Sequence, residues 1–181
     1  MADVSVRPAS PDDAGEIARI QVLTWRTGYD SVLPQPVLAA LDEPQIASQW
    51  RAAAASPPSV RHHLLVATEG EWRVGFAAFG PDPDAQPDDP EPDSTAAITV
   101  LLVEPRWGRR GHGSRLLSAV ADLARIDGVN RLVAWVPVGH APSLELYRSS
   151  GWEPDGLQRT LDTGAGEINE IRLHTSLATD T

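Results

Sequence analysis

The sequence predicts a single α/β domain (α+β in some classification schemes) that spans residues 1–181. Two observations support this class. A chain of 181 residues with 41% hydrophobic and 22% charged residues has the size and composition of one globular domain. In the second half, two continuous β-rich runs are each followed by a helical pattern, whereas pairs of strands in hairpin-like arrangement precede and follow them. We therefore expect one sheet flanked by helices.

The first third of the chain predicts one strand and then helices. Val4–Pro8 alternates like a short strand, and the Ser-Pro-Asp-Asp segment at 10–13 supplies an N-cap, a proline at the first helical position and an acid at the third. Apolar residues at three- and four-residue spacing then predict an amphipathic helix to about Thr27. Residues 33–55 form a second helical region, expected in two pieces because Asp-Glu-Pro at 42–44 interrupts its pattern.

The middle of the chain predicts strands and one long loop. Residues 62–68 and 71–79 are rich in aliphatic and aromatic residues and indicate a hairpin. The loop at about 81–94 is acidic and rich in proline, so we expect it to be mobile within the single domain. Ala96–Val103 is a continuous β-rich run, typical of a central strand buried on both faces. The remaining elements are expected at 111–126 (helix), 132–136 (strand), 141–150 (helix), 152–161 (strand) and 167–174 (strand).

Composition excludes several functions. The net charge of −10 argues against a nucleic-acid partner, because contacts to phosphates need a basic face. The chain has no cysteine, which removes thiolate zinc sites and cysteine nucleophiles, and we expect no metal. The N-terminus lacks the pattern of a signal peptide, and no apolar run reaches the ~20 residues of a membrane span. A cytoplasmic protein without a membrane partner is expected.

A glycine-rich turn carries the most specific signal. It leaves the buried run that ends at Val103 and opens the helix at 111–126. Glycines at 111 and 113 allow a ligand close to the backbone, and the first amides of the helix are unpaired donors at its positive end. Four arginines surround this point, namely Arg106, Arg109, Arg110 and Arg115. A pyrophosphate would fit such a pocket, while the spacing and the absence of lysine exclude a P-loop.

These residues resemble the coenzyme A signature of the GNAT acetyltransferase superfamily, [Q/R]-x-x-G-x-[G/A]. The match covers 108–113, with Gly108 at the usual Gln or Arg position, where Arg106 or Arg109 could compensate. Residues 140–152 are similar to the family pattern N-x-x-A-x-x-[FL]-Y-x-x-x-G-F. Segments 6–14 and 24–29 also look like the opening strand and first helix of bacterial members, so the resemblance extends over nearly the whole chain.

The resemblance implies the GNAT fold, a mostly antiparallel mixed sheet of six to seven strands that is splayed between strands 4 and 5 and flanked by about four helices. It implies transfer of an acetyl group from acetyl-CoA to the amine of a small molecule or protein, by direct attack in a ternary complex. The alternative is a sensor or regulatory protein that binds acyl-CoA without turnover. Binding without amine-dependent release of thiol would favour the sensor.

The resemblance also assigns site residues. Tyr147 falls on the tyrosine that protonates the departing thiolate, with a packing role as the alternative. The backbone amides of Leu102 or Val103 would polarise the thioester and bind the pantetheine arm. His140 replaces an asparagine that contacts the cofactor. The turn residues implied in cofactor binding are Arg109, Arg110, Gly111, His112, Gly113 and Ser114. Residues at the end of the first helix that border the acceptor pocket are Trp25, Arg26 and Tyr29.

The general base is left open by the sequence. Many family members carry a glutamate on strand 4, but the corresponding position here is Ala97. Ordered water, an acid on another element or an already neutral amine are the alternatives, and Glu104 at the end of the strand is one candidate. The acceptor amine, the acyl-chain preference and the formation of a homodimer by strand exchange or edge pairing are also left open.

Overall fold

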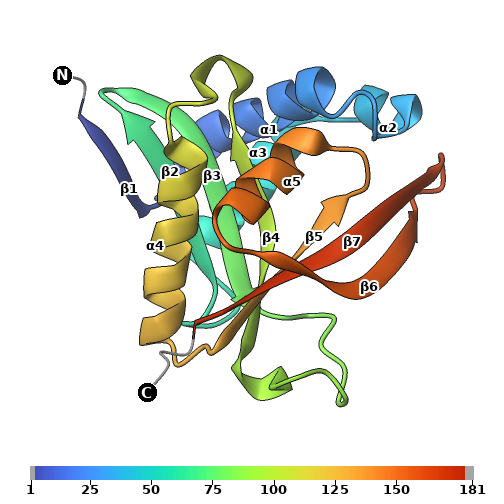
Figure 1. The fold of residues 1–181 in the computed structure, drawn as a ribbon. Helices are drawn as coiled ribbons and strands as arrows, with labels where there is room; N and C mark the ends of the chain where they lie inside the picture. Colours follow the sequence, from blue (N-terminus) through green and yellow to red (C-terminus); the bar gives the residue numbers. More distant parts are fainter. Residues whose placement is uncertain (1–2, 178–181) are drawn as a thin grey trace.

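A computed structural model describes residues 3–177 as one seven-stranded sheet of order β1-β2-β3-β4-β5-β7-β6 (Figure 1). The strands are β1 (Val4–Pro8), β2 (His63–Glu69), β3 (Trp72–Pro81), β4 (Thr95–Val103), β5 (Arg131–Pro137), β6 (Glu153–Asp162) and β7 (Glu167–Ser176). The helices are α1 (Ala14–Gly28), α2 (Gln35–Ala39), α3 (Glu43–Ala55), α4 (His112–Ile126) and α5 (Ala141–Ser149). The β4–β5 pair is parallel and every other described pair is antiparallel, which confirms the predicted fold class.

The start of α1 shows how local signals set an element. A short 3-10 turn, Pro11–Asp13, precedes α1, and the backbone N–H of Ser10 donates to the Asp13 carboxylate at 2.8 Å. That carboxylate is buried and also accepts from Arg7 at 2.8 Å and from Arg73 at 3.1 Å. The hydrogen bond from Arg7, more than any other contact, holds the pKa of Asp13 well below its usual range. One acid therefore closes the 3-10 turn that leads into α1 and ties this turn to β1 and β3.

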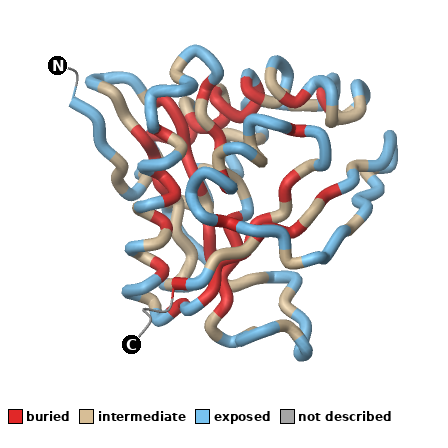
Figure 2. The backbone as a smooth tube through the Cα atoms, viewed as in Figure 1, coloured by how far each residue is buried: buried red, intermediate tan, exposed pale blue. Residues whose placement is uncertain are grey.

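The two faces of the sheet are covered by different helices (Figures 1 and 2). On one face, Leu116 and Val120 of α4 pack into a core with Leu65 and Ile98. On the other face, α1 packs against β3 and β4 through a second cluster that includes Phe76, while α3 packs against α1. Each of β3 and β4 therefore contributes alternate side chains to two separate cores.

Between β4 and β5 the sheet opens, as the family resemblance implied. The parallel pairing runs only from Thr95–Arg131 to Ile98–Ala134. The next residue, Thr99, has no partner in the β3 register, where Phe79 pairs with Ile98 and Ala78 with Val100, so it forms a β-bulge. Such a bulge bends the strand and increases its twist, which turns the rest of β4 away from β5.

The bulge also corrects the expectation that this strand is buried on both faces. Residues 95–98 are buried, but Thr99 is exposed and the residues that follow are mostly half-buried. The β-rich run is continuous in sequence, yet its second half pairs only with β3 and borders an opening on its β5 side.

The acidic loop joins β3 to β4 and contacts the far edge of the sheet. Asp84 pairs with Arg159 of β6 at 2.8 Å, and Asp89 pairs with Arg172 of β7 at 2.7 Å. Two ion pairs therefore tether a segment whose composition alone predicts mobility. That mobility stays a prediction.

Candidate active site

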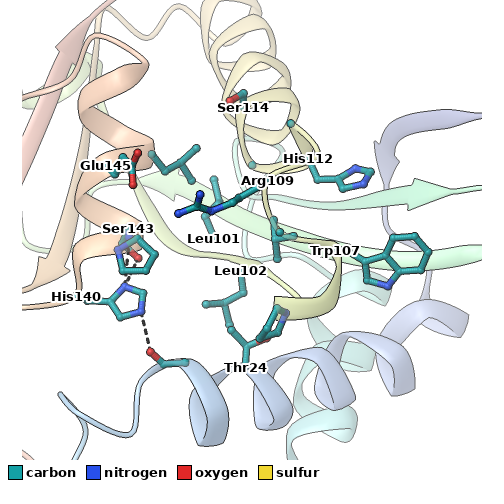
Figure 3. A pocket seen from close by; sticks show the side chains of 18 of the residues that line it. Thr24, Leu101, Leu102, Trp107, Arg109, His112, Ser114, His140, Ser143 and Glu145 are labelled. Atoms are coloured by element: carbon teal, nitrogen blue, oxygen red, sulfur yellow. Dashed lines mark hydrogen bonds between the residues drawn. The ribbon is translucent and has the colours of Figure 1, made fainter.

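A cleft of about 730 Å³ follows the opening in the sheet (Figure 3). Its floor is the second half of β4, residues 101–103. We call one limit the arginine end, formed by Arg109, Gly111 and Ser114 at the start of α4. We call the other the histidine end, formed where the C-terminus of α1 meets the N-terminus of α5. Its residues are Thr24, Gly28, Tyr29, His140 and Ser143.

The open edge of β4 offers backbone groups to the cleft. The N–H of Glu104 donates to Val74 of β3 at 2.9 Å. Because successive peptide groups along a strand point to opposite sides, the N–H of Val103 points away from β3, toward the opening, whereas that of Leu102 points toward β3. Of the two amides that the sequence nominated, the strand geometry therefore favours Val103 as the donor to a ligand.

The arginine end is a helix N-terminus entered through a left-handed residue. Gly111 has φ 82° and is the N-cap of α4, so the backbone can turn directly into the helix. Gly113 has another reason to lack a side chain, because an added Cβ would lie 2.9 Å from Leu146 of α5. The first glycine thus shapes the turn, and the second lets α4 and α5 approach one another.

The arginines of the turn divide into paired and unpaired ones. Arg106 forms an ion pair with Glu104, and Arg110 pairs with Glu69 at 2.9 Å while lying 5.0 Å from the centre of the Trp107 ring. Arg109 forms no ion pair within residues 3–177, and Figure 3 shows its guanidinium in the cleft. Arg115 also forms no ion pair in the described chain, and its guanidinium donates to the carbonyl oxygen of Arg110 at 2.9 Å. Arg109 is the arginine that lines the cleft, which favours it over Arg106 as the compensating residue and over Arg110 as a cofactor ligand.

His112 lies apart from the cleft interior. Its ring is buried, 2% exposed for the residue, and its Nε2 is 2.8 Å from Glu69 on β2. Figure 3 shows the ring directed away from Arg109. The side chain thus fastens the turn to β2, and the residue is among those that line the cleft, so its role in cofactor binding stays a prediction.

Glu104 does not fit the role of general base. It is 2% exposed, and its two carboxylate oxygens bind Arg19 of α1 at 3.0 Å and Arg106 at 2.5 Å. Both oxygens of this buried carboxylate are occupied by guanidinium groups, and Glu104 does not line the cleft, so an amine in the cleft does not reach it. Its position in the sequence made Glu104 a candidate general base, whereas its contacts indicate that it holds Arg19 and Arg106 in place.

The histidine end is a closed chain of hydrogen bonds. The Nδ1 of His140 is 2.7 Å from the Ser143 hydroxyl, which is 2.9 Å from the hydroxyl of Tyr29. The Nε2 of His140 is 2.9 Å from the carbonyl oxygen of Gly28, and the Tyr29 and His140 rings stack at 3.7 Å. Burial, opposed by the bond to Gly28, lowers the pKa of His140. Both ring nitrogens are engaged within the protein, while the residue lines the cleft, so contact of His140 with the cofactor stays a prediction.

Tyr147 is part of the core next to this end. It is 6% exposed and packs edge-on against Trp152 at 4.9 Å. Burial, reinforced by Tyr29, raises the pKa of its phenol. Its hydroxyl makes no hydrogen bond to the described part of the chain, and the residue does not line the cleft. Tyr147 therefore packs in the core, and its role as the proton donor stays a prediction.

The other two residues at the end of α1 do not reach the cleft. Trp25 is half-buried and packs against the core on the α1 face. Arg26 is exposed and donates to the carbonyl oxygens of Leu38 at 3.4 Å and Leu41 at 3.2 Å. Of the three substrate residues that the sequence nominated, only Tyr29 lines the cleft.

Two polar groups of the cleft escaped sequence reasoning. The Thr24 hydroxyl and the Trp107 indole N–H are buried and have no hydrogen-bond partner among residues 3–177. A buried polar group without a partner costs about 1–3 kcal/mol. Both residues line the cleft, although the two polar atoms themselves are covered by the protein. No pattern in the sequence marks Thr24, because one threonine within an amphipathic helix is common.

Neither a metal centre nor a membrane span is evident in the described chain. Residues 3–177 hold no group of three or more His, Asp or Glu side chains that could bind a metal ion. None of the helices described is long and apolar enough to cross a membrane.

A splayed sheet, a cleft along its open edge and a cationic helix start together define a protein that binds an extended anionic ligand beside β4. The chain belongs to the acetyltransferase (GNAT) family, whose family model matches residues 23–152. This membership agrees with the resemblance seen in the turn and in residues 140–152.

Individual proteins support the same assignment. The chain is 29% identical over 146 residues to YuaI, an uncharacterized N-acetyltransferase of Bacillus subtilis, covering 81% of this chain and 78% of YuaI. Its fold is similar to yncA of Salmonella typhimurium, solved with acetyl-CoA, at a TM-score of 0.71 and 19% identity over 99% of this chain and 96% of yncA. It is also similar to the paia N-acetyltransferase of Thermoplasma acidophilum, solved with coenzyme A, at a TM-score of 0.73 and 11% identity over 96% and 99% of the two chains.

Proposed function

We propose that this protein is an N-acetyltransferase that transfers the acetyl group of acetyl-CoA directly to an amine within a ternary complex. One observation carries the proposal. The β4–β5 pairing stops after Ile98–Ala134, and the resulting cleft runs along the open edge of β4 to the N-terminus of α4. A long thioester with a pyrophosphate at its far end matches this combination of exposed backbone and positive helix terminus.

The residues present fit the cosubstrate. Arg109 and the first amides of α4, at Gly113 and Ser114, would hold the pyrophosphate. The Val103 amide would hydrogen-bond the pantetheine arm or the thioester carbonyl, where a fixed donor stabilises developing negative charge. Acetyl-CoA supplies the activated acetyl group, and the chain supplies binding, orientation and proton transfer.

Tyr147 is the proton donor of the proposal. Its hydroxyl has no partner in the described chain, so no hydrogen bond has to be broken before it donates. Burial raises the pKa of the phenol, which keeps Tyr147 in the protonated form from which it can donate to the leaving thiolate.

The acceptor is a primary amine of a small molecule or a protein. The histidine end lies on the α1 side of the opening, where Tyr29 lines the cleft and Thr24 carries a buried hydroxyl without a partner among residues 3–177. The net charge of −10 is compatible with a cationic amine.

Isothermal titration with acetyl-CoA and CoA tests binding, and thiol release on the same sample tests turnover against polyamines, aminoglycosides, amino acids and peptides. We expect binding together with amine-dependent release. Binding without release from any amine would favour the acyl-CoA sensor, and the absence of binding would overturn the proposal.

Tyr147→Phe tests the proton donor. Because the Tyr147 hydroxyl makes no hydrogen bond in the described chain, the variant should fold with unchanged stability. It should lose about 10²-fold in kcat, a typical contribution of general acid catalysis. An unchanged kcat would restrict Tyr147 to packing.

A further inference from the structure

The hydrogen bonds of the histidine end have forced directions. The carbonyl oxygen of Gly28 can only accept, so the Nε2 of His140 carries the hydrogen of the neutral ring. Its Nδ1 is then an acceptor and takes the proton of the Ser143 hydroxyl, 2.7 Å away. The Ser143 oxygen in turn accepts from the phenol of Tyr29 at 2.9 Å. The chain is oriented from Tyr29 through Ser143 to His140.

This orientation matters because the cleft offers no carboxylate in the place where a base is needed. The strand position that would carry a glutamate is Ala97, and Glu104 is held by Arg19 and Arg106. Glu145 is the one carboxylate among the described residues that line the cleft, and it is exposed on α5 (Figure 3). Tyr29, by contrast, is 9% exposed and lines the cleft at the histidine end.

We propose that Tyr29 is the general base of the transferase and that Ser143 and His140 relay the proton it displaces. An ammonium group gives one proton to the Tyr29 oxygen, the Tyr29 proton passes to Ser143, and the Ser143 proton passes to Nδ1 of His140. The products are a neutral amine, an unchanged phenol and hydroxyl, and an imidazolium. One positive charge has moved from the amine to His140.

This inference rests on the proposed acetyl transfer. The other protons of the reaction are exchanged during that transfer. The C–N bond forms as the C–S bond breaks, and the leaving thiolate takes a proton from Tyr147. The nitrogen then loses its second proton, which returns Tyr147 to its protonated form. His140 then releases the first proton to solvent. The net reaction converts an ammonium ion and a thioester into an amide, a thiol and one free proton.

The surroundings of His140 suit a transient charge. The Gly28 carbonyl lies at the C-terminus of α1, where the helix dipole favours an imidazolium. Burial and the N-terminus of α5 oppose that charge, which keeps the resting ring neutral and returns the proton after each turnover. The other ionisable groups around this end are Tyr29 on α1, Glu145 and Tyr147 on α5, and Arg109 across the cleft.

His140→Asn is the decisive variant. Asparagine can still accept from the Ser143 backbone N–H and cap α5, but it cannot hold a proton. The assay is kcat/KM from pH 6 to pH 9, by thiol release, with methylamine and with the fastest amine of the panel. For the wild type, kcat/KM should rise with pH at the acid side of this range and then reach a plateau. The variant should be about 10²-fold slower at pH 7, an effect typical of a lost general base.

The pH dependence separates a relay from a structural role. Without the relay the enzyme depends on free neutral amine, whose fraction rises tenfold per pH unit below an alkylamine pKa of about 10.4. The deficit of His140→Asn should therefore shrink to less than tenfold at pH 9. Ser143→Ala and Tyr29→Phe should show the same profile, with acetyl-CoA affinity unchanged within about twofold.

Matched controls complete the design. Ser150→Ala, on the same helical segment but outside the cleft, should keep the wild-type profile. The proposal is overturned if His140→Asn keeps the wild-type rate at pH 7, if it loses the same factor at every pH, or if Glu145→Gln alone reproduces the profile. Failure of wild type to turn over any amine would instead count against the proposed function.

Discussion

The two ends of the cleft are built from different interactions. At the arginine end, Arg109 has no ionic partner in residues 3–177 and lies beside the positive terminus of α4. At the histidine end, His140, Ser143 and Tyr29 satisfy one another through neutral hydrogen bonds and a stacked ring pair. One end presents charge without a partner, and the other presents an ordered chain of hydroxyl and imidazole groups.

This difference teaches what each end does. An unpaired positive charge at the start of a helix attracts an anion, so the arginine end contributes to the affinity for the cosubstrate. The hydrogen-bonded chain at the histidine end is neutral and attracts an anion only weakly, but its orientation determines the path along which a proton can move. Substitutions at the arginine end should therefore change cosubstrate affinity, whereas substitutions at the histidine end should change turnover.

The largest effect expected is on affinity, at the arginine end. Arg109→Ala should weaken acetyl-CoA binding by about 10- to 100-fold, because a charge-assisted hydrogen bond contributes about 1.5–3 kcal/mol. Arg110→Ala removes the same charge from a residue already paired with Glu69 and should change affinity by less than about threefold. Titration calorimetry at fixed ionic strength measures both. Equal losses of acetyl-CoA affinity in the two variants would show that the ion pair of Arg110 does not distinguish it from Arg109.

A second effect concerns the contact between the helices that carry the two ends. Gly113→Ala should destabilise the fold by about 1–3 kcal/mol, because the new methyl group presses on Leu146. Combining it with Leu146→Ala should cost less than the sum of the two single changes, since the shortened side chain makes room. Urea unfolding of the four proteins gives this coupling. Strict additivity would contradict the packing explanation of Gly113.

Thr24 should show a smaller effect, at the histidine end. Thr24→Val removes a buried hydroxyl that lacks a partner, so the free energy of unfolding should stay constant or rise by about 1 kcal/mol. The amine KM should rise by up to about tenfold, the value of one hydrogen bond, with acetyl-CoA affinity unchanged. A loss of stability, measured by urea unfolding, would show that the hydroxyl already has an internal role.

The smallest effect on binding and turnover is expected outside both ends, in the acidic loop. The hydrogen bond from Arg172 lowers the pKa of Asp89 from its ordinary 3.8 to about 2. A lowered carboxyl pKa contributes stability above pH 3.8, and that stability is lost as the pH falls toward 2. Asp89→Asn should thus cost about 2 kcal/mol at pH 7, and its stability should converge with wild type as the pH falls toward 2. A change in acetyl-CoA affinity would show that the loop acts on the cleft.

Much of the fold could be predicted because its signals are local. Ser10 and Asp13 start the first helix, the acid-and-proline segment interrupts the second, and the hairpin and the helix after Gly111 have the predicted positions. The family pattern also located the turn. The burial of β4 was predicted wrongly in part, because the bulge at Thr99 depends on strand register and not on the composition of the run.

The candidate site was predictable only in outline. Sequence reasoning placed Arg109, Gly111 and Tyr29 at the cleft correctly, but it could not rank four neighbouring arginines or identify the partners of His112 and His140. Arg110 pairs with a residue 41 positions away, and Tyr29 bonds to one 114 positions away. No local pattern reports such contacts.

By itself, the sequence determined the class of the domain, the order of its elements and the turn that opens α4, because short-range periodicity, capping and glycine conformation decide these features. Only the tertiary structure decided that Arg109 has no ionic partner among residues 3–177 while Glu104 is held by two arginines. It also decided that His140 bonds to Ser143, which in turn bonds to Tyr29. The physical reason is that ion pairs and hydrogen bonds act over about 3 Å. Their partners are chosen by the packing of elements that lie far apart in the chain.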